Sequence, residues 1–259
     1  MRQRILDQLA AITNRHDVRI LYAVESGSRG WGFASPDSDY DVRFVYLHRT
    51  DWYLSVDEKK DCIELPVDPV LDINGWDAKK ALLLYKKSNP TLLEWLSSPV
   101  VYIEDGSFAG SLRAMLPDYF SVVHAMHHYF HTARNTHKET IGKPTIKLKK
   151  YFYMLRPLLA CAWIGERHTC PPMEFSHLLE SAMIDGQVRE EIARLTERKR
   201  DALESQEEPV NAVLMGFIEV RLSEYEQTLN TMKPEPHDGY DRLSGLFRSS
   251  LNEYWMERK

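Results

Sequence analysis

Two aspartates and a glycine-serine pair stand close together near the start of the chain. The segment "ESGSRGWGFASPDSDYDVRFVY" carries Gly27 and Ser28, followed by Asp39 and Asp41 in a stretch of strand-like character. Side chains two positions apart on a strand point to the same face, so Asp39 and Asp41 can present two carboxylates side by side. That arrangement is repulsive without a cation, and Mg²⁺ binds proteins through a few carboxylates together with phosphate oxygens. The pair therefore predicts a divalent metal site.

The residues ahead of the aspartates are of the types that bind phosphate. Gly27 and Ser28 fall where the first strand should end, and a turn there lets backbone N–H groups and a hydroxyl approach a phosphate closely. Arg29 adds a forked donor for phosphate. The spacing from Gly27 to Asp41 predicts that the turn holds the phosphates of a nucleotide while the aspartates hold its metal.

A third carboxylate is expected if two metal ions flank an in-line attack. Asp72, in "PVLDIN", lies at the end of the third predicted strand. Its expected role is to bridge the metal ions and to help deprotonate an acceptor hydroxyl. Asp68, four residues earlier in a proline-kinked segment, is the competing candidate. We prefer Asp72.

A basic run interleaved with aromatic residues, "KLKKYFYMLR", occupies residues 147–156. It is either a solvated helix face with its aromatic residues in the core, or a contact to a triphosphate or an RNA backbone. Lys147 and Lys150 lie on one face of a helix, so they are the candidates for nucleotide binding.

Histidines cluster between residues 124 and 137, in "HAMHHYFHTARNTH". His127 and His131 have the i, i+4 spacing of a helical metal pair, but no HExxH pattern and no third ligand accompany them. We prefer a helix that uses these histidines for polar packing and at exposed positions.

Composition limits the classes of function. The chain has 259 residues with a formal net charge of -5, which disfavours a general DNA-coating role. Its three cysteines are too few and too scattered for a disulfide framework. No stretch has the length of apolar sequence that a membrane helix needs, and the first residues lack the apolar core of a signal peptide. We expect a cytoplasmic protein.

The periodicity of apolar residues predicts an α+β fold in two domains. Strands are expected within residues 18–27, 40–48, 70–73 and 100–105, after a first helix at 2–14. Asp77 and the Asn89-Pro90 pair are expected to begin two further helices. Helices are expected at 107–138, 145–164, 173–204 with a break near Gly186, 209–230 and 240–256, with a proline-rich connector at 232–239. The predicted domains are a catalytic domain at 1–105 and an all-helical domain at 106–259.

The sequence also resembles a known family. "GSRGWGFASPDSDYD" resembles the G-S-x(n)-D-x-D signature of the DNA polymerase beta type nucleotidyltransferase superfamily, and the whole pattern resembles its RNA repair pathway DNA polymerase beta family. The strings "LDINGWDAKKALLLYKKSNPTLLEWLSSP" and "KLKKYFYMLRPLLA" are also similar to that family. The resemblance covers about residues 20 to 165.

The resemblance implies a mixed sheet flanked by helices, with the turn at Gly27 and Ser28 contacting phosphate and Asp39, Asp41 and Asp72 as the metal triad. It implies transfer of a nucleoside monophosphate from an NTP to a hydroxyl, with release of pyrophosphate and Mg²⁺ or Mn²⁺ as cofactor. An RNA end as acceptor, and an RNA ligase as partner in the same pathway, follow only from the family's association with RNA ligases.

Two rival functions remain open from the sequence. One is the same chemistry on another acceptor, such as a protein hydroxyl that becomes AMPylated or a small molecule. The other is a non-catalytic module that binds a nucleotide and retains the fold.

Overall fold

The computed structural model describes residues 1–66, 68–201, 203, 205–233 and 239–255. The backbone divides into two compact units. The sheet unit contains the described residues of 1–27, 39–119 and 237–259, and the helical unit contains those of 28–38 and 120–236. Near the Gly-Ser turn the chain therefore leaves the sheet unit after residue 27 and returns to it after residue 38.

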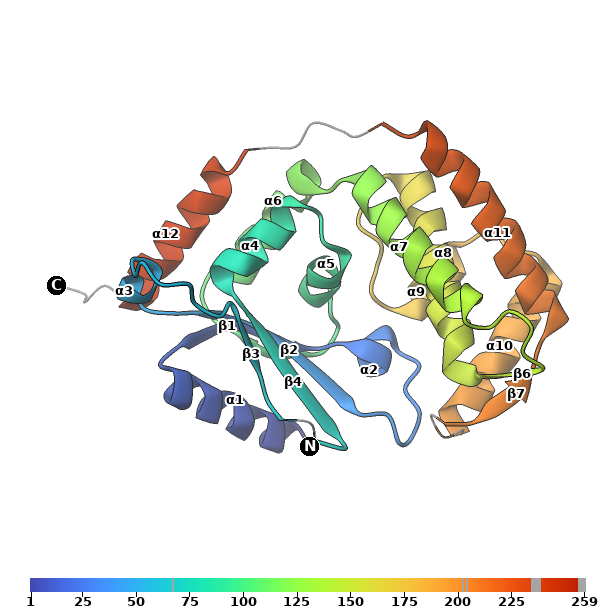
Figure 1. The fold of residues 1–259 in the computed structure, drawn as a ribbon, viewed down its shortest axis with the longest axis horizontal. Helices are drawn as coiled ribbons and strands as arrows, with labels where there is room; N and C mark the ends of the chain where they lie inside the picture. Colours follow the sequence, from blue (N-terminus) through green and yellow to red (C-terminus); the bar gives the residue numbers. More distant parts are fainter. Residues whose placement is uncertain (67, 202, 204, 234–238, 256–259) are drawn as a thin grey trace. The chain divides into compact units, whose positions relative to one another are not determined.

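The sheet unit is built on a mixed five-stranded sheet in the order β3-β4-β2-β1-β5 (Figure 1). The strands are β1 (Arg19–Glu25), β2 (Tyr40–Leu47), β3 (Cys62–Glu64), β4 (Leu71–Asp77) and β5 (Val101–Glu104). β2 and β4 pair in parallel, and the other neighbours pair antiparallel. The helices are α1 (Arg2–His16), α3 (Thr50–Tyr53), α4 (Ala78–Lys86), α5 (Pro90–Leu96), α6 (Phe108–Tyr119) and α12 (Asp241–Trp255). The predicted α+β fold is confirmed.

Helices pack on both faces of this sheet. The buried side of α1, with Ile5 and Leu9, shares a core with Val42 of β2. On the opposite face Trp76 of β4 packs against Trp95 of α5, with ring centroids 4.0 Å apart. Because alternate residues of a strand share a face, the residues at positions 72 and 41 lie on the same face as Trp76.

Side-chain caps begin two of these helices where the sequence predicts them. The Asp77 carboxylate accepts the backbone N–H of Lys79 at the start of α4. The Asn89 side chain accepts the N–H of Leu92, and Pro90 is the first residue of α5. Both caps satisfy N–H groups that a helix leaves without an internal partner.

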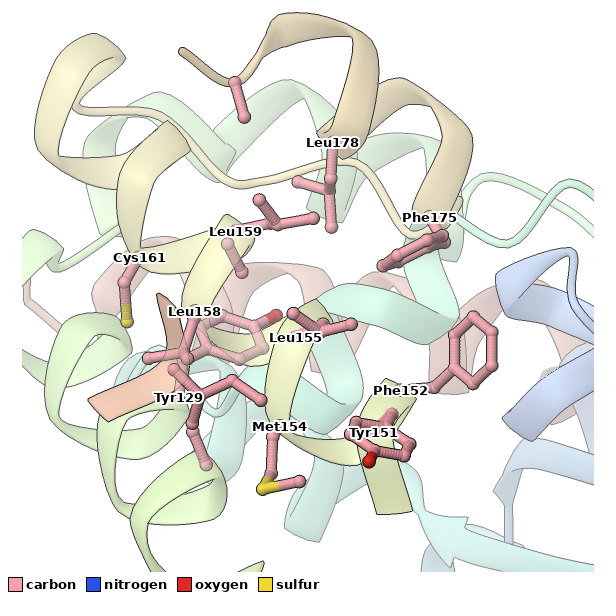
Figure 2. Packing of buried hydrophobic residues seen from close by; sticks show 14 of the residues in the cluster. Tyr129, Tyr151, Phe152, Met154, Leu155, Leu158, Leu159, Cys161, Phe175 and Leu178 are labelled. Carbon is pink, nitrogen blue, oxygen red and sulfur yellow. The ribbon is translucent and has the colours of Figure 1, made fainter. Parts of the chain in front are cut away.

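The helical unit consists of α7 (Val122–Lys138), α8 (Leu148–Arg167), α9 (Phe175–Ser181), α10 (Gly186–Asp201) and α11 (Ala212–Thr231), together with β6 (Thr145–Lys147) and β7 (Glu207–Pro209). Figure 2 shows part of its core, in which Phe152, Leu155 and Leu158 of α8 are grouped with Phe175 and Leu178 of α9. α2 (Gly27–Trp31) begins in the sheet unit and ends in the helical unit.

Several elements differ from the sequence-based prediction. The single helix predicted at 107–138 is α6 and α7, because the Ser121 side chain accepts the N–H of His124 and begins a new helix. The predicted helix at 145–164 starts with β6, which pairs antiparallel with β7, so the second unit is not all-helical. The third predicted strand extends from Leu71 to Asp77, and β3, which pairs with it, was missed.

The predicted domain boundary at residue 105 also differs from the division into units, because α6 and α12 group with the sheet. Arg113 of α6 donates to the carbonyl of Leu96 and pairs with Glu104. Phe247 of α12 packs edge-on against Tyr53, with centroids 4.9 Å apart. The predicted connector at 232–239 falls largely outside the described residues, at 234–238.

Among the helices that the structure describes, none has both the length and the apolar character needed to cross a bilayer.

Candidate functional site

The turn after β1 brings the backbone of Gly27 against the side chain of Asp41. Ser26 donates its N–H to the Asp41 carbonyl at 2.8 Å, and Gly27 has a φ of 56°. A Cβ at position 27 would lie 1.9 Å from Oδ2 of Asp41. Only glycine fits this approach, because it lacks the Cβ and adopts positive φ readily.

Asp41 and Asp72 lie directly opposite each other on neighbouring parallel strands. They are Cα partners in the register of β2 and β4. Residues paired in this way project their side chains from the same face of the sheet. The structure therefore brings together two of the three predicted metal ligands.

Asp39 is placed differently from the prediction that it shares a strand with Asp41. β2 begins at Tyr40, so Asp39 lies one residue before the strand, at an exposed position. Asp68, the competing third acid, accepts the N–H groups of Val70 and Leu71 and pairs with Arg4 at 2.6 Å. These hydrogen bonds lower the pKa of Asp68, and they fix the turn that leads into β4.

Arg43 was missed by the sequence analysis, although it follows Asp41 by two residues on the same strand face. Its Nη2 donates to Oδ1 of Asp41 at 2.8 Å and to Oδ2 of Asp72 at 2.7 Å. Its Nη1 donates to the carbonyl oxygens of Asp72 and Val42 at 3.1 and 3.2 Å. One guanidinium thus links the two carboxylates.

Glu25, at the end of β1, is a second residue that the sequence analysis missed. It is 1% exposed, and its Oε1 accepts the backbone N–H of Asp41 at 2.9 Å. Its Oε2 accepts the hydroxyl of Tyr102, and burial together with this hydrogen bond raises the pKa of that phenol. Glu25 therefore fixes the backbone at Asp41. The sequence signal for this residue was an acidic side chain at the end of a strand that is apolar from Ile20 to Val24.

Ser28 and Arg29 belong to the helical unit. The carbonyl of Ser28 accepts the N–H of Phe33 at 3.1 Å, and Nη2 of Arg29 donates to the carbonyl of Ser38 at 2.6 Å. Arg29 therefore closes the segment 28–38 on itself. The predicted phosphate contacts of both residues stay predictions.

Aromatic and basic side chains fix the segment 28–38 within the helical unit. Phe33 stacks on Phe152 with centroids 4.4 Å apart, and Arg156 lies 4.7 Å from the ring of Trp31. The ammonium group of Lys199, itself 1% exposed, donates to the hydroxyl of Ser35. Arg156 is 3% exposed, so this member of the basic run belongs to the core.

Lys147 and Lys150, the predicted nucleotide-binding lysines, are both in the helical unit. Lys147 is exposed at the end of β6, just before α8. Lys150 forms an ion pair with Glu139, which lowers the pKa of that carboxyl. Contact of either lysine with a nucleotide stays a prediction.

The histidine pair on α7 is exposed, as the sequence analysis prefers. The rings of His127 and His131 stack with centroids 5.9 Å apart, and burial followed by the charge of His131 lowers the pKa of His127. Over the residues that the structure describes, no three His, Cys, Asp or Glu side chains are grouped so as to hold a metal ion.

Comparison with known families gives the class of the protein, a nucleotidyltransferase of the DNA polymerase beta kind. The chain belongs to the RNA repair pathway DNA polymerase beta family, whose model matches residues 1–249. The resemblance found in the sequence is therefore confirmed.

Two individual proteins are similar to this chain. The Bacillus subtilis (strain 168) protein named "Uncharacterized protein YcgL" is 42% identical over 257 residues, and the match covers 99% of each chain. The crystal structure of a nucleotidyltransferase-like protein from Exiguobacterium sibiricum 255-15 is 14% identical with a TM-score of 0.31, and covers 95% of this chain and 89% of that one.

Proposed function

We propose that the protein transfers a nucleoside monophosphate from an NTP to a hydroxyl at an RNA end and releases pyrophosphate. The observation that carries this proposal is the pairing of Asp41 with Asp72 on parallel strands, beside a turn that only glycine fits, in a chain of the DNA polymerase beta kind. The RNA end and an RNA ligase as pathway partner rest on the family description.

The residues at this position fit a divalent cation. Asp41 and Asp72 offer carboxylate oxygens from one sheet face, and the absence of a side chain at Gly27 makes room for the Asp41 carboxylate itself. Carboxylate oxygens are the ligands that Mg²⁺ and Mn²⁺ prefer. We assign Asp41 and Asp72 to the cation. Asp39, which lies one residue before β2, is assigned as the third carboxylate from its place in the sequence alone. When bound, the ion neutralises phosphate charge and favours loss of the acceptor's proton.

In the proposed reaction the acceptor oxygen forms a bond to the α-phosphorus. The bond from that phosphorus to the oxygen bridging to the β-phosphate breaks, and pyrophosphate leaves with the electron pair. Asp72, whose side chain is 53% exposed, accepts the hydroxyl proton. Ser28 and Arg29 orient the β and γ phosphates, and Lys147 or Lys150 neutralises developing charge. These four assignments rest on residue type and spacing.

We place the protein in the cytoplasm. In support, Cys62, Cys161 and Cys170 are all free thiols.

The test is release of pyrophosphate with each of the four NTPs and Mg²⁺ or Mn²⁺, with and without single-stranded or tRNA-like RNA. Asp41→Asn and Asp72→Asn should lower the rate at least about a hundredfold, the scale on which loss of electrostatic stabilisation of a transition state acts. Asp68→Asn is the matched control, because Asp68 caps a turn four residues before Asp72. It should keep most of the activity.

Label from an α-labelled NTP identifies the acceptor. Label on RNA supports the proposal, whereas label on protein or on a small molecule, still dependent on Asp41 and Asp72, replaces the RNA end with that acceptor. Tight NTP binding without pyrophosphate release under any condition contradicts transfer and favours a nucleotide-binding module.

A further inference from the structure

Arg43 holds the two carboxylates at the point where the proposed function requires a cation. Its Nη2 lies between Oδ1 of Asp41 and Oδ2 of Asp72, at 2.8 and 2.7 Å. The same guanidinium donates through Nη1 to two carbonyl oxygens of β2 and β4. All four hydrogen bonds of this side chain therefore end on the two strands that carry the aspartates.

The position of Arg43 follows from the repulsion between the aspartates. Like charges directly opposite each other on neighbouring strands destabilise a sheet. The side chains of Arg43 and Asp41 are only 19% and 22% exposed, so water screens their charges partially. A guanidinium stays protonated at any physiological pH and has a planar set of donors suited to two carboxylates. Arg43 supplies the counter-charge to both carboxylates.

We propose that Arg43 competes with the divalent cation for Asp41 and Asp72, and so sets the affinity of the site for metal. The inference rests on the proposed function, because it assigns the cation to those two carboxylates. A cation bound by both would take up lone pairs that Arg43 now uses. The guanidinium then keeps its positive charge beside the bound cation, which weakens binding of a free ion.

The same charge favours a cation that arrives with a nucleotide. A triphosphate brings several negative charges, and a guanidinium is a strong donor to phosphate oxygens. Arg43 therefore opposes free Mn²⁺ more than it opposes Mn²⁺ accompanied by a triphosphate. The expected result is a site that selects the metal-nucleotide complex over the free metal.

The experiment is a Mn²⁺ titration followed by electron paramagnetic resonance, which measures free Mn²⁺ without any turnover. It compares wild type with Arg43→Gln, first with Mn²⁺ alone and then with Mn²⁺ plus a non-hydrolysable ATP analogue. Loss of one positive charge next to the cation should tighten binding of free Mn²⁺ about tenfold. The gain should be smaller when the analogue is present.

Two variants serve as controls. Arg19→Gln removes an equal charge from the same sheet, where Arg19 pairs with Asp105, and should leave Mn²⁺ binding within about twofold of wild type. Arg43→Lys keeps the charge at the site and should retain weak binding of free Mn²⁺. A gain in the Arg19 variant equal to that in Arg43→Gln would overturn the inference, because it would be an effect of net charge.

The outcomes separate this inference from the proposed function. If folded Arg43→Gln binds Mn²⁺ as weakly as wild type or more weakly, Arg43 does not compete with the cation. If Asp41→Asn loses Mn²⁺ binding in the same experiment, the metal site itself is still supported. Absence of Mn²⁺ binding in every variant overturns both.

Folding of the variant is itself informative. Without metal, Arg43→Gln leaves the two carboxylates facing each other, so Mn²⁺ should raise its melting temperature more than that of wild type. A variant that folds only with Mn²⁺ supports the inference. One that stays unfolded at saturating Mn²⁺ overturns it, because the cation then does not replace the guanidinium.

Discussion

At Gly27 the site depends on the absence of a side chain. Gly27→Ala would place a Cβ 1.9 Å from Oδ2 of Asp41 and would strain a backbone with a φ of 56°. We expect the variant to lose about 1–3 kcal/mol of stability and most of its Mn²⁺ binding and pyrophosphate release. Both can be measured by chemical denaturation and by the assays above.

Gly32→Ala separates backbone strain from displacement of the carboxylate. Gly32 also has a positive φ, of 86°, but no atom lies within 4 Å of a Cβ built there. It should therefore cost similar stability and leave Mn²⁺ binding intact. Equal loss of Mn²⁺ binding in the two variants would show that the contact with Asp41 is not the cause.

The sequence was informative about residues whose roles follow from local spacing. It indicated Gly27 and Asp41 by their types and separation, and Asp72 by its place in a strand. It could not show that Asp72 stands opposite Asp41, because that depends on the register of two strands that are distant in sequence. Arg43 was within reach of the same alternation rule that paired Asp39 with Asp41. It was missed because only acidic residues were expected to lie at the metal site.

At the level of the elements, ionisation of Asp77, the residue that caps α4, lowers the stability of the folded chain at neutral pH. Burial raises the pKa of Asp77 to about 6, although the hydroxyl of Tyr53 and the backbone of α4 donate hydrogen bonds to it. The folded chain therefore binds this proton more tightly than the unfolded chain does. Its contribution to stability falls as pH rises from about 4 to about 6, by up to about 3 kcal/mol.

The titration of His48 changes the stability in the opposite direction over nearly the same pH range. Burial lowers its pKa to about 4, so the unfolded chain binds that proton more tightly and stability rises with pH between about 4 and about 6.5. In wild type the two slopes oppose each other. Asp77→Asn, which keeps a capping side chain, should leave a stability that rises with pH.

Urea denaturation at several pH values between about 4 and 7 measures this slope. Asp118→Asn is the matched control, because it removes an exposed carboxylate of the sheet unit that pairs with Arg242 and is no cause of the raised pKa of Asp77. It should keep the shape of the wild-type curve. An Asp77→Asn curve parallel to wild type would contradict the buried titration.

The segment 28–38 makes a second prediction at this level. Phe33 is 2% exposed and stacks on Phe152, so Phe33→Ala should destabilise the helical unit by about 3–5 kcal/mol. Phe33→Leu fills more of the space and should cost clearly less. Thermal unfolding followed by circular dichroism compares the two, and equal small losses would mean that the ring does not fix the segment.

The elements differ in how far the sequence determined them. The helix starts at Asp77 and Asn89 were predicted because a cap needs only neighbouring residues. β3, β6 and β7 were missed because each has three residues and is held by pairing with a distant strand. A short strand has little periodicity of its own, so its partner determines its structure.

At the scale of the whole molecule, each compact unit is built from stretches that are not continuous in the sequence. The last described helix, α12, groups with the sheet unit although the helical unit precedes it in sequence. Leu243 of α12 is 2% exposed, and the helix contacts α4 and α6. The sequence-based boundary at residue 105 assigned this helix to the second domain because helical periodicity does not reveal which partner a helix packs against.

A chain ending at Lys233 tests this assignment. Loss of α12 should expose apolar surface on α4 and α6, so hydrogen exchange measured by mass spectrometry should quicken in those helices and in α3. α7 and α8 should keep their protection.

Leu243→Ala is the milder variant and should cost about 2–4 kcal/mol in the sheet unit while leaving the helical unit unchanged. Faster exchange in α7 and α8, with α4 and α6 unaffected, would instead favour the boundary at residue 105, because the apolar side of α12 would then belong to the helical unit.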